Sequence, residues 1–312
     1  MEYLKKEYEE NLEIQDLISA VWKNRILVVS LTSLSIIISV IVALSLPNYY
    51  QSSAVLAPVD DDNSLKSQLS SLSGLASISG ISIPGQSIDK SSEALKRLDS
   101  FKFFSEHFLP YINLENLLAV KQWIPETNKI IYKENMFQDS TKTWIRKVSF
   151  PKKKIPSAQE AYKEFNKIIT ITQDNKTKFI LVSVEHRSPY IAKQWVEILI
   201  DNINKSMREK SEEEVIKSVI FLNENLQNAR LSEVKEAIAR LLETQIKNQM
   251  LISASEDYVL KVIDSPIVPE DKFKPRRAII CISGAIFGFL LSIIFSLILY
   301  LRSKRFNDSA ET

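Results

Sequence analysis

Two long apolar runs dominate the pattern of hydrophobic and polar positions, one near each end of the chain. Residues 26–46 and residues 278–301 carry no charged side chain. At about 1.5 Å per residue, a helix over the first run is about 31 Å long, which matches a hydrocarbon core of about 30 Å. We therefore predict two transmembrane helices. A cleaved signal peptide is the alternative for the first run, but its apolar part is shorter and lies closer to the N-terminus.

Cationic residues near the two runs predict which side of the membrane each end occupies. Cytoplasmic flanks are enriched in lysine and arginine. The flanks that we expect to be cytoplasmic carry Lys5, Lys6, Lys23, Arg25, Arg302, Lys304 and Arg305. A second cluster, Lys272, Lys274, Arg276 and Arg277, lies on the outer flank and disagrees. Because the first helix usually decides the orientation, we expect both termini in the cytoplasm.

This topology divides the chain into five parts. We expect a cytoplasmic segment over residues 1–25, transmembrane helices over 26–46 and 278–301, an outer α+β domain over 47–277, and a cytoplasmic tail over 302–312. The outer domain is long enough for a hydrophobic core of its own. Neither short terminal segment is, so we expect no cytoplasmic kinase or cyclase domain.

The outer domain shows both strand and helix patterns. Runs rich in β-branched and aromatic residues predict strands over residues 49–59, 168–172, 178–185 and 258–264. Turn residues between the second and third of these predict that the two strands form a hairpin. A helix is predicted over 91–109, and another from Ser157, which has the N-cap spacing to Glu160. Residues 63–92 are rich in serine and glycine. They read as a surface segment or a partner contact, and the sequence does not decide between the two.

A very long helical pattern follows the hairpin. From residue 189 to residue 255 the chain has no glycine and no proline after Pro189, and its apolar residues recur at helical spacing. We predict one helix of roughly 100 Å. The alternative is a hairpin that breaks near 205–214, where apolar residues are few. The residues expected to form the packing stripe are Trp195, Leu222, Leu226 and Leu241. Such a stripe needs a neighbour, so we expect other copies of the chain to pack against it as a coiled-coil-like homo-oligomer.

Prolines and glycines mark the return to the membrane. Pro266, Pro269 and Pro275 favour extended backbone directly before the second apolar run. Inside that run, Gly284 and Gly288 form a G-x-x-x-G motif, which allows two helices to approach closely. Its partner is equally well the first transmembrane helix or a neighbouring subunit.

Composition excludes several kinds of chemistry. The chain has only 5 Gly among 312 residues, and no phosphate-binding glycine loop or nucleophile elbow occurs. One cysteine and two histidines leave little for a metal site, and a net charge of +2 gives no reason to expect nucleic acid. We therefore expect no enzyme activity, no cofactor and no metal. Residues 151–156 place three lysines between two prolines. An exposed loop is the favoured interpretation, with anionic lipid headgroups or a sugar-pyrophosphate as alternative partners.

Taken in order, these segments resemble the Wzz-type polysaccharide co-polymerases, the chain-length determinants of lipopolysaccharide O-antigen synthesis. The resemblance covers nearly the whole chain. It is carried by residues 14–25, 50–58, 91–104 and 182–204, by the proline stretch, and by the two membrane glycines. The chain departs from the family in having a sparse proline stretch and fewer glycines in the second helix.

The resemblance implies a non-enzymatic, ring-forming protein of the inner membrane whose main domain lies in the periplasm. Such proteins set the modal length of a polysaccharide that a separate polymerase builds on undecaprenyl-linked repeat units. Two other hypotheses are a two-span sensor and an export adaptor. The short tail lacks an output domain for a sensor, and the glycine-rich β-domains of an adaptor are missing.

Overall fold

The computed structural model describes residues 22, 24–59, 90–255 and 257–308, and separates into two compact units. One unit combines the N-terminal residues through Asn48 with the chain from Phe273 onward. The other is Tyr49–Lys272. The Ser- and Gly-rich segment 63–92 lies almost entirely outside the described residues. The architecture is an α+β domain with a 40-residue helix and an apolar helix at each end, so the predicted fold class is confirmed.

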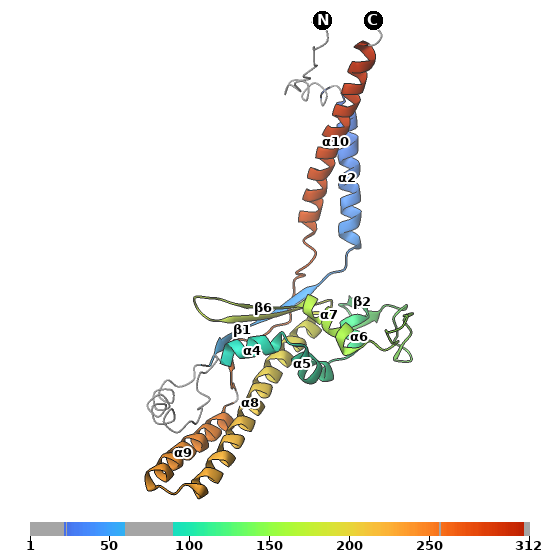
Figure 1. The fold of residues 1–312 in the computed structure, drawn as a ribbon. Coiled ribbons are helices and arrows are strands. Elements are labelled where there is room, and N and C mark those ends of the chain that lie inside the picture. Colours follow the sequence, from blue (N-terminus) through green and yellow to red (C-terminus); the bar gives the residue numbers. More distant parts are fainter. Residues whose placement is uncertain (1–21, 23, 60–89, 256, 309–312) are drawn as a thin grey trace, which may run out of the picture. The chain divides into compact units, whose positions relative to one another are not determined.

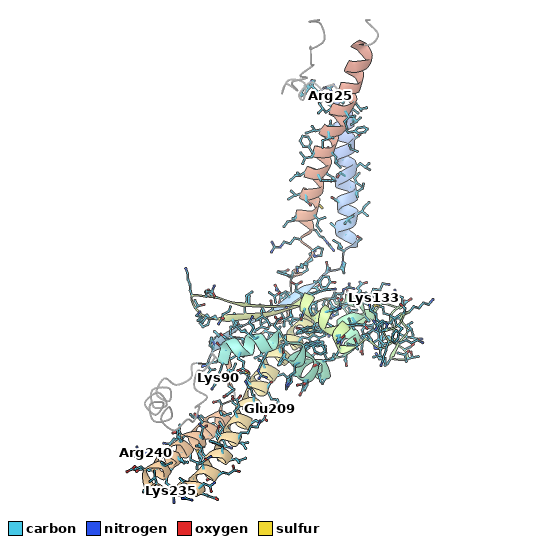
Figure 2. The ribbon with its side chains drawn as sticks, viewed as in Figure 1. Arg25, Lys90, Lys133, Glu209, Lys235 and Arg240 are labelled. Carbon is cyan, nitrogen blue, oxygen red and sulfur yellow. The ribbon has the colours of Figure 1, made fainter. Side chains whose placement is uncertain are left out.

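The first unit is a pair of apolar helices. α2 (Arg25–Ser45) and α10 (Arg277–Asp308) pack side by side (Figure 1). Arg25 begins α2 (Figure 2). Both helices are long and apolar enough to cross a membrane, over Arg25–Ser45 and Arg277–Leu299.

The second unit is built on an antiparallel sheet of four strands in the order β6-β7-β1-β8. Its strands are β1 (Tyr50–Pro58), β6 (Ile169–Gln173), β7 (Ile180–His186) and β8 (Leu260–Asp264). The strand that enters this unit, β1, therefore pairs with the strand that leaves it, with Val55 opposite Asp264. Beyond the end of β8 the two segments stay together, because the Ser52 hydroxyl donates to the carbonyl of Ile267 at 2.8 Å.

Short helices and two small hairpins complete the unit. The helical elements are α4 (Lys90–Leu98), α5 (Phe101–Phe103), the π-helix η1 (Phe104–Phe108), the 3-10 helix η2 (Leu109–Tyr111), α6 (Leu114–Leu118) and α7 (Ala158–Ile168). The hairpins pair β2 (Val120–Ile124) with β3 (Lys129–Tyr132), and β4 (Phe137–Gln138) with β5 (Thr143–Trp144). The helix predicted over 91–109 is thus divided where Ser100 caps a new helix by accepting from the Phe103 amide at 3.1 Å. Ser157 caps α7 as predicted, accepting from the Glu160 amide at 3.3 Å.

The core lies between the sheet, η1, α7 and the first half of the long helix. Phe104, Phe108 and Phe165 are fully buried and pack against one another with tilted rings, whose centroids are 4.7–5.9 Å apart. The edge of the Trp195 ring meets Phe108 at 5.8 Å. Burying such aromatic side chains contributes about 1.5–3 kcal/mol each, so this cluster fixes the start of the long helix against the sheet.

The prediction of one continuous helix to residue 255 is wrong. α8 (Pro189–Asn228) ends at Ala229, whose backbone is extended, and α9 (Ser232–Ala254) folds back along it (Figure 1). The chain folds back because the apolar stripe of the helical pattern can bury its own second half against its first. Leu222 on α8 and Ile238 on α9 are buried in the described structure, so the second part of the pattern covers the first.

The break is also not at 205–214, the position of the alternative. There the helix continues because its polar residues have partners outside α8. Lys210 pairs with Glu93 of α4 at 2.6 Å, and Arg208 donates to the Ser255 carbonyl at 2.8 Å. Met207, in the same stretch, is buried in the core.

A buried asparagine joins α8 to the last strand. The Asn204 side-chain oxygen accepts from the amides of Val259 and Leu260 at 3.0 and 2.9 Å, and its nitrogen donates to the Leu260 carbonyl at 2.9 Å. Side chain and backbone groups are all buried, so each satisfies the other in a place that water does not reach.

We predict that Asn204→Ala lowers the free energy of unfolding by about 2–4 kcal/mol, because each buried polar group left unpaired costs about 1–3 kcal/mol. Urea unfolding of the full chain in detergent micelles measures this. Asn228→Ala is the matched control, since the Asn228 side chain is exposed and bonds only to the Glu224 carbonyl one turn earlier. Its change stays below about 0.5 kcal/mol. Equal unfolding midpoints for the two variants would contradict the prediction.

Candidate functional site

The two membrane-helix candidates meet through small residues. A side-chain carbon added at Gly284 would lie 2.7 Å from the Cβ of Ser39, and one added at Gly288 would lie 2.6 Å from the Ser35 hydroxyl. Neither distance leaves room for a side chain. Of the two partners that the G-x-x-x-G motif left open, the described structure places α2 against both glycines.

This small-residue stripe is longer than the motif. Ser292 and Ser296 continue the four-residue spacing after Gly288, and both are fully buried. The Ser35 hydroxyl donates to the Gly284 carbonyl at 2.9 Å, and the Asn24 amide donates to the Ser296 hydroxyl at 3.2 Å. Hydrogen bonds of this kind help to hold helices together in a lipid environment. The sequence prediction missed both serines, although their spacing was a signal for them.

The three prolines are spread over the return segment. Pro266 is buried, and Pro269 and Pro275 are half-buried. Pro266 and Pro269 belong to the unit with the sheet, whereas Pro275 belongs to the helix pair. In the helix pair, Arg277 donates to the Asn48 side chain at 3.2 Å, which links the two chain ends that leave it.

The residues predicted to form the long-helix stripe are fully or partly covered by other parts of the same chain. Trp195 is in the core. Leu222 is buried in the hairpin, and Leu226 and Leu241 are half-buried there. A second set of apolar side chains on the hairpin is exposed, and on α8 it comprises Ile216, Ile220 and Phe221.

A buried histidine stabilises the junction of β7 and α8. His186 Nδ1 accepts from the Ser188 amide at 2.9 Å, so the proton lies on Nε2, which donates to the Asn116 carbonyl at 2.9 Å. Burial lowers the pKa of His186 to about 4, against the two backbone hydrogen bonds, which raise it. Its neighbour Arg187 donates to the carbonyl of Val120 at 2.8 Å. Both residues hold β2 and α6 to the start of α8, a role that no sequence motif predicts.

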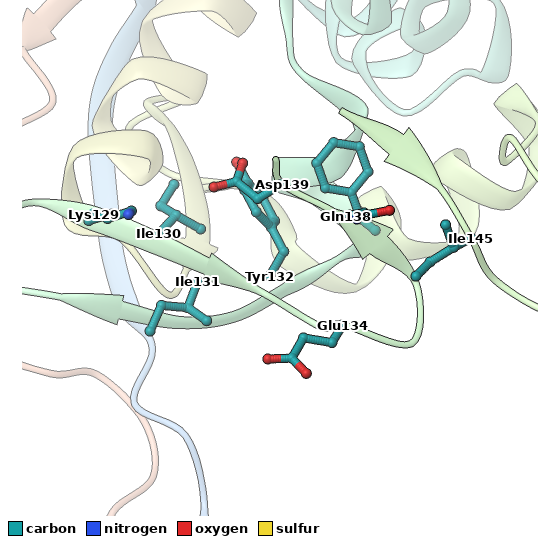
Figure 3. Close-up of a pocket in the computed structure, with 9 residues that line it drawn as sticks. Lys129, Ile130, Ile131, Tyr132, Glu134, Gln138, Asp139 and Ile145 are labelled. Atoms are coloured by element: carbon teal, nitrogen blue, oxygen red, sulfur yellow. The ribbon is translucent and has the colours of Figure 1, made fainter. Parts of the chain in front are cut away.

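A shallow pocket of about 460 Å³ lies beside the small hairpins (Figure 3). Its lining includes the carboxylates of Glu134 and Asp139 and the ring of Tyr132. Burial, with Glu115 and Asp139 nearby, raises the pKa of Tyr132 to about 12. The hydroxyl therefore stays protonated at neutral pH, and it donates to the Asn116 side chain at 2.7 Å. Tyr132 is thus a structural hydrogen-bond donor.

The chain thus combines two units. One is a close pair of apolar helices, and the other is an α+β unit whose first strand pairs with its last. Both helices of the pair are candidate membrane spans. In comparison with known proteins, residues 10–101 match the family model "Wzz: Chain length determinant protein". This stretch is similar to the Wzz family, as the resemblance indicated. Wzz co-polymerases are chain-length regulators and not enzymes.

Two solved structures are similar to the chain. A "full-length bacterial polysaccharide co-polymerase" is 14% identical, with 93% of this chain and 99% of that chain covered and a TM-score of 0.38. A fragment of WzzB, a polysaccharide co-polymerase from Salmonella Typhimurium, is also 14% identical, with 73% and 100% covered and a TM-score of 0.29. No curated protein matches the chain.

We predict that Gly288→Leu pushes α10 away from α2 by a few ångströms, because the Leu side chain meets Ser35 and the backbone of Thr32. Spin labels on cysteines at positions 44 and 279, in a Cys281→Ser background, measure the separation of the two helices. Ser283→Leu is the matched control, since Ser283 is exposed on α10 and bonds only to the Ile280 carbonyl. An unchanged distance in Gly288→Leu would refute close packing at this glycine.

We also predict a pH dependence that belongs to His186. In the unfolded chain this histidine binds a proton near its ordinary pKa of 6.5, whereas in the folded chain it does so only near pH 4. Its contribution to stability is therefore complete above pH 6.5. It is lost as the pH falls toward 4, by up to about 1.4 kcal/mol per pH unit. Urea unfolding across this range measures the slope. His186→Gln should reduce the slope, and an unchanged slope in that variant would contradict the prediction.

Proposed function

We propose that this protein sets the modal chain length of a lipid-linked surface polysaccharide of the lipopolysaccharide O-antigen type, which a separate polymerase makes. The observation that carries the proposal is the family match over residues 10–101. That stretch contains α2 and β1, the elements that place a candidate membrane helix directly before the sheet. The second candidate helix, α10, follows the sheet. The function is that of a scaffold, and it uses no cofactor.

The proposed location is the bacterial inner membrane. In this arrangement α2 and α10 span the bilayer, residues 1–25 and 302–312 are cytoplasmic, and the unit Tyr49–Lys272 is periplasmic. The cations before α2 and after residue 301 support this orientation. The polysaccharide grows on its undecaprenyl carrier on the same side as the proposed periplasmic unit.

The proposed active form is a ring of several copies. Its support is the exposed apolar side of the α8–α9 hairpin, where Ile220 and Phe221 expose 54% and 50% of their surfaces. Val234 and Met250 add to it from α9. Apolar side chains that one chain leaves uncovered are the usual contact between copies. Other side chains of the hairpin, such as Lys235 and Arg240, are charged (Figure 2).

The polymerase is proposed to contact the helix pair. The faces of α2 and α10 that point away from each other carry long apolar side chains such as Ile37 and Phe287, both more than half exposed. These faces are available to lipid or to another membrane protein. The face of α10 that carries Gly284 and Gly288 is not, because α2 packs against it. A helix pair that keeps one shape offers the polymerase a fixed surface.

The test removes the gene and compares the surface polysaccharide on a gel. We expect polymer to persist with a broadened length distribution, and the wild-type gene to restore the mode. The double variant Ile220→Ser, Phe221→Ser should restore it poorly and should also shift the purified protein to smaller oligomers. Glu224→Ser, at an exposed polar position of the same helix, is the matched control. An unchanged length distribution after deletion would reject the proposed function, and a variant that assembles normally would reject the role of this surface.

A further inference from the structure

The loop over residues 145–155 exposes apolar and cationic side chains together. Phe150 leaves 96% of its surface exposed, more than any other large hydrophobic side chain in the part of the chain that the structure describes. Ile155 exposes 66%. Further exposed side chains of the loop are Ile145, Val148, Lys147, Lys152, Lys153 and Lys154. Because the Phe150 ring is almost fully exposed, it adds no buried apolar surface that would stabilise the fold of this chain.

The base of this loop is firmly held. The Arg146 guanidinium donates to the carbonyls of Lys153 and Lys154 at 2.7 and 2.8 Å, and it pairs with Glu160 at the start of α7. A turn closes the tip, where the Lys152 amide donates to the Ser149 carbonyl at 3.0 Å. The loop therefore presents Phe150 outward from a fixed base.

Among the described residues, none of the four lysines comes within 4.0 Å of a carboxylate. Lys152 acts at longer range on Glu160, but that carboxylate already pairs with Arg146. Lysines beside an exposed aromatic ring suit an anionic bilayer surface. The ring enters the boundary between headgroups and acyl chains, and the ammonium groups are attracted by the lipid phosphates.

Side-chain contacts connect the loop to β1, the first strand of its own unit. The Tyr50 ring at the start of β1 meets Trp123 of β2 edge-on at 5.4 Å. From there the contacts continue to the second hairpin, since the Phe137 ring meets both Tyr132 and Trp144 edge-on, at 5.1 and 5.3 Å between ring centroids. Ile145 and the loop follow directly.

We propose that the loop over residues 145–155 is a membrane-surface anchor that inserts Phe150 into an anionic phospholipid leaflet while its four lysines bind the headgroup phosphates. The proposal rests on the membrane location given above and not on the control of chain length. It gives the sheet unit a third attachment to the bilayer, besides the two ends of the chain.

The test uses the full chain with Cys281→Ser and an environment-sensitive fluorophore on Ser149→Cys, which keeps Phe150 in place. The protein is reconstituted in nanodiscs of phosphatidylcholine alone, or of phosphatidylcholine and phosphatidylglycerol in a three-to-one ratio. In the anionic discs we expect a blue-shifted emission and about twofold stronger quenching by lipids that carry a doxyl group near the headgroup. Phe150→Ser, or Lys152→Glu with Lys153→Glu and Lys154→Glu, should abolish both effects. Arginine at the same three positions should preserve them.

A fluorophore on Leu231→Cys, in the turn between α8 and α9, gives the reference for a probe in water. Emission and quenching at position 149 equal to this reference would overturn the proposal. So would shielding that is the same in both kinds of disc and survives Phe150→Ser, because that result indicates contact with protein. The membrane location is checked separately by the reactivity of the native Cys281 thiol in α10 toward a water-soluble maleimide. A protected thiol with an unshielded loop rejects the anchor alone, whereas a reactive thiol rejects the membrane placement.

Discussion

The hydrogen bonds of Asn204 are the constraint on which the unit with the sheet depends. One side chain binds three backbone groups of Val259 and Leu260, and so ties the middle of α8 to the first residues of β8. Among the described strands β8 pairs with β1 alone, at the edge of the sheet, so the sheet fixes its position from one side and the helix from the other. The helical hairpin and the sheet are thereby held to each other through β8.

The helix pair follows a different physical rule. Hydrophobic burial does not favour contact between two helices that lipid already solvates, so close packing and hydrogen bonds must supply it. α10 meets this need with a glycine or serine at every fourth position from Gly284 to Ser296, and α2 contributes Ser35 and Asn24. The same sequence feature would be unremarkable in water. In a membrane it specifies which face of each helix is hidden and which is available to a partner.

Most elements could be predicted from the sequence because local patterns determine them. The apolar runs, the 168–185 hairpin and the Ser157 cap need only neighbouring residues to be recognised. The hairpin of α8 and α9 could not, because no glycine or proline marks residues 229–231, and the turn is set by which halves of the stripe cover each other. His186 and Asn204 were missed for a similar reason. Their partners lie about 70 and 56 residues away, and nothing in the local sequence names them.

The pairing of β1 with β8 has a consequence for how the protein is made. Val55 and Asp264 are partners separated by more than 200 residues, so the sheet stays incomplete until nearly the whole unit has left the ribosome. α10 follows only a dozen residues after β8. The strand that closes the sheet and the second candidate membrane helix are therefore synthesised within the same short interval. Until β8 is made, β1 has an unpaired edge, and an unpaired strand edge can pair with another chain.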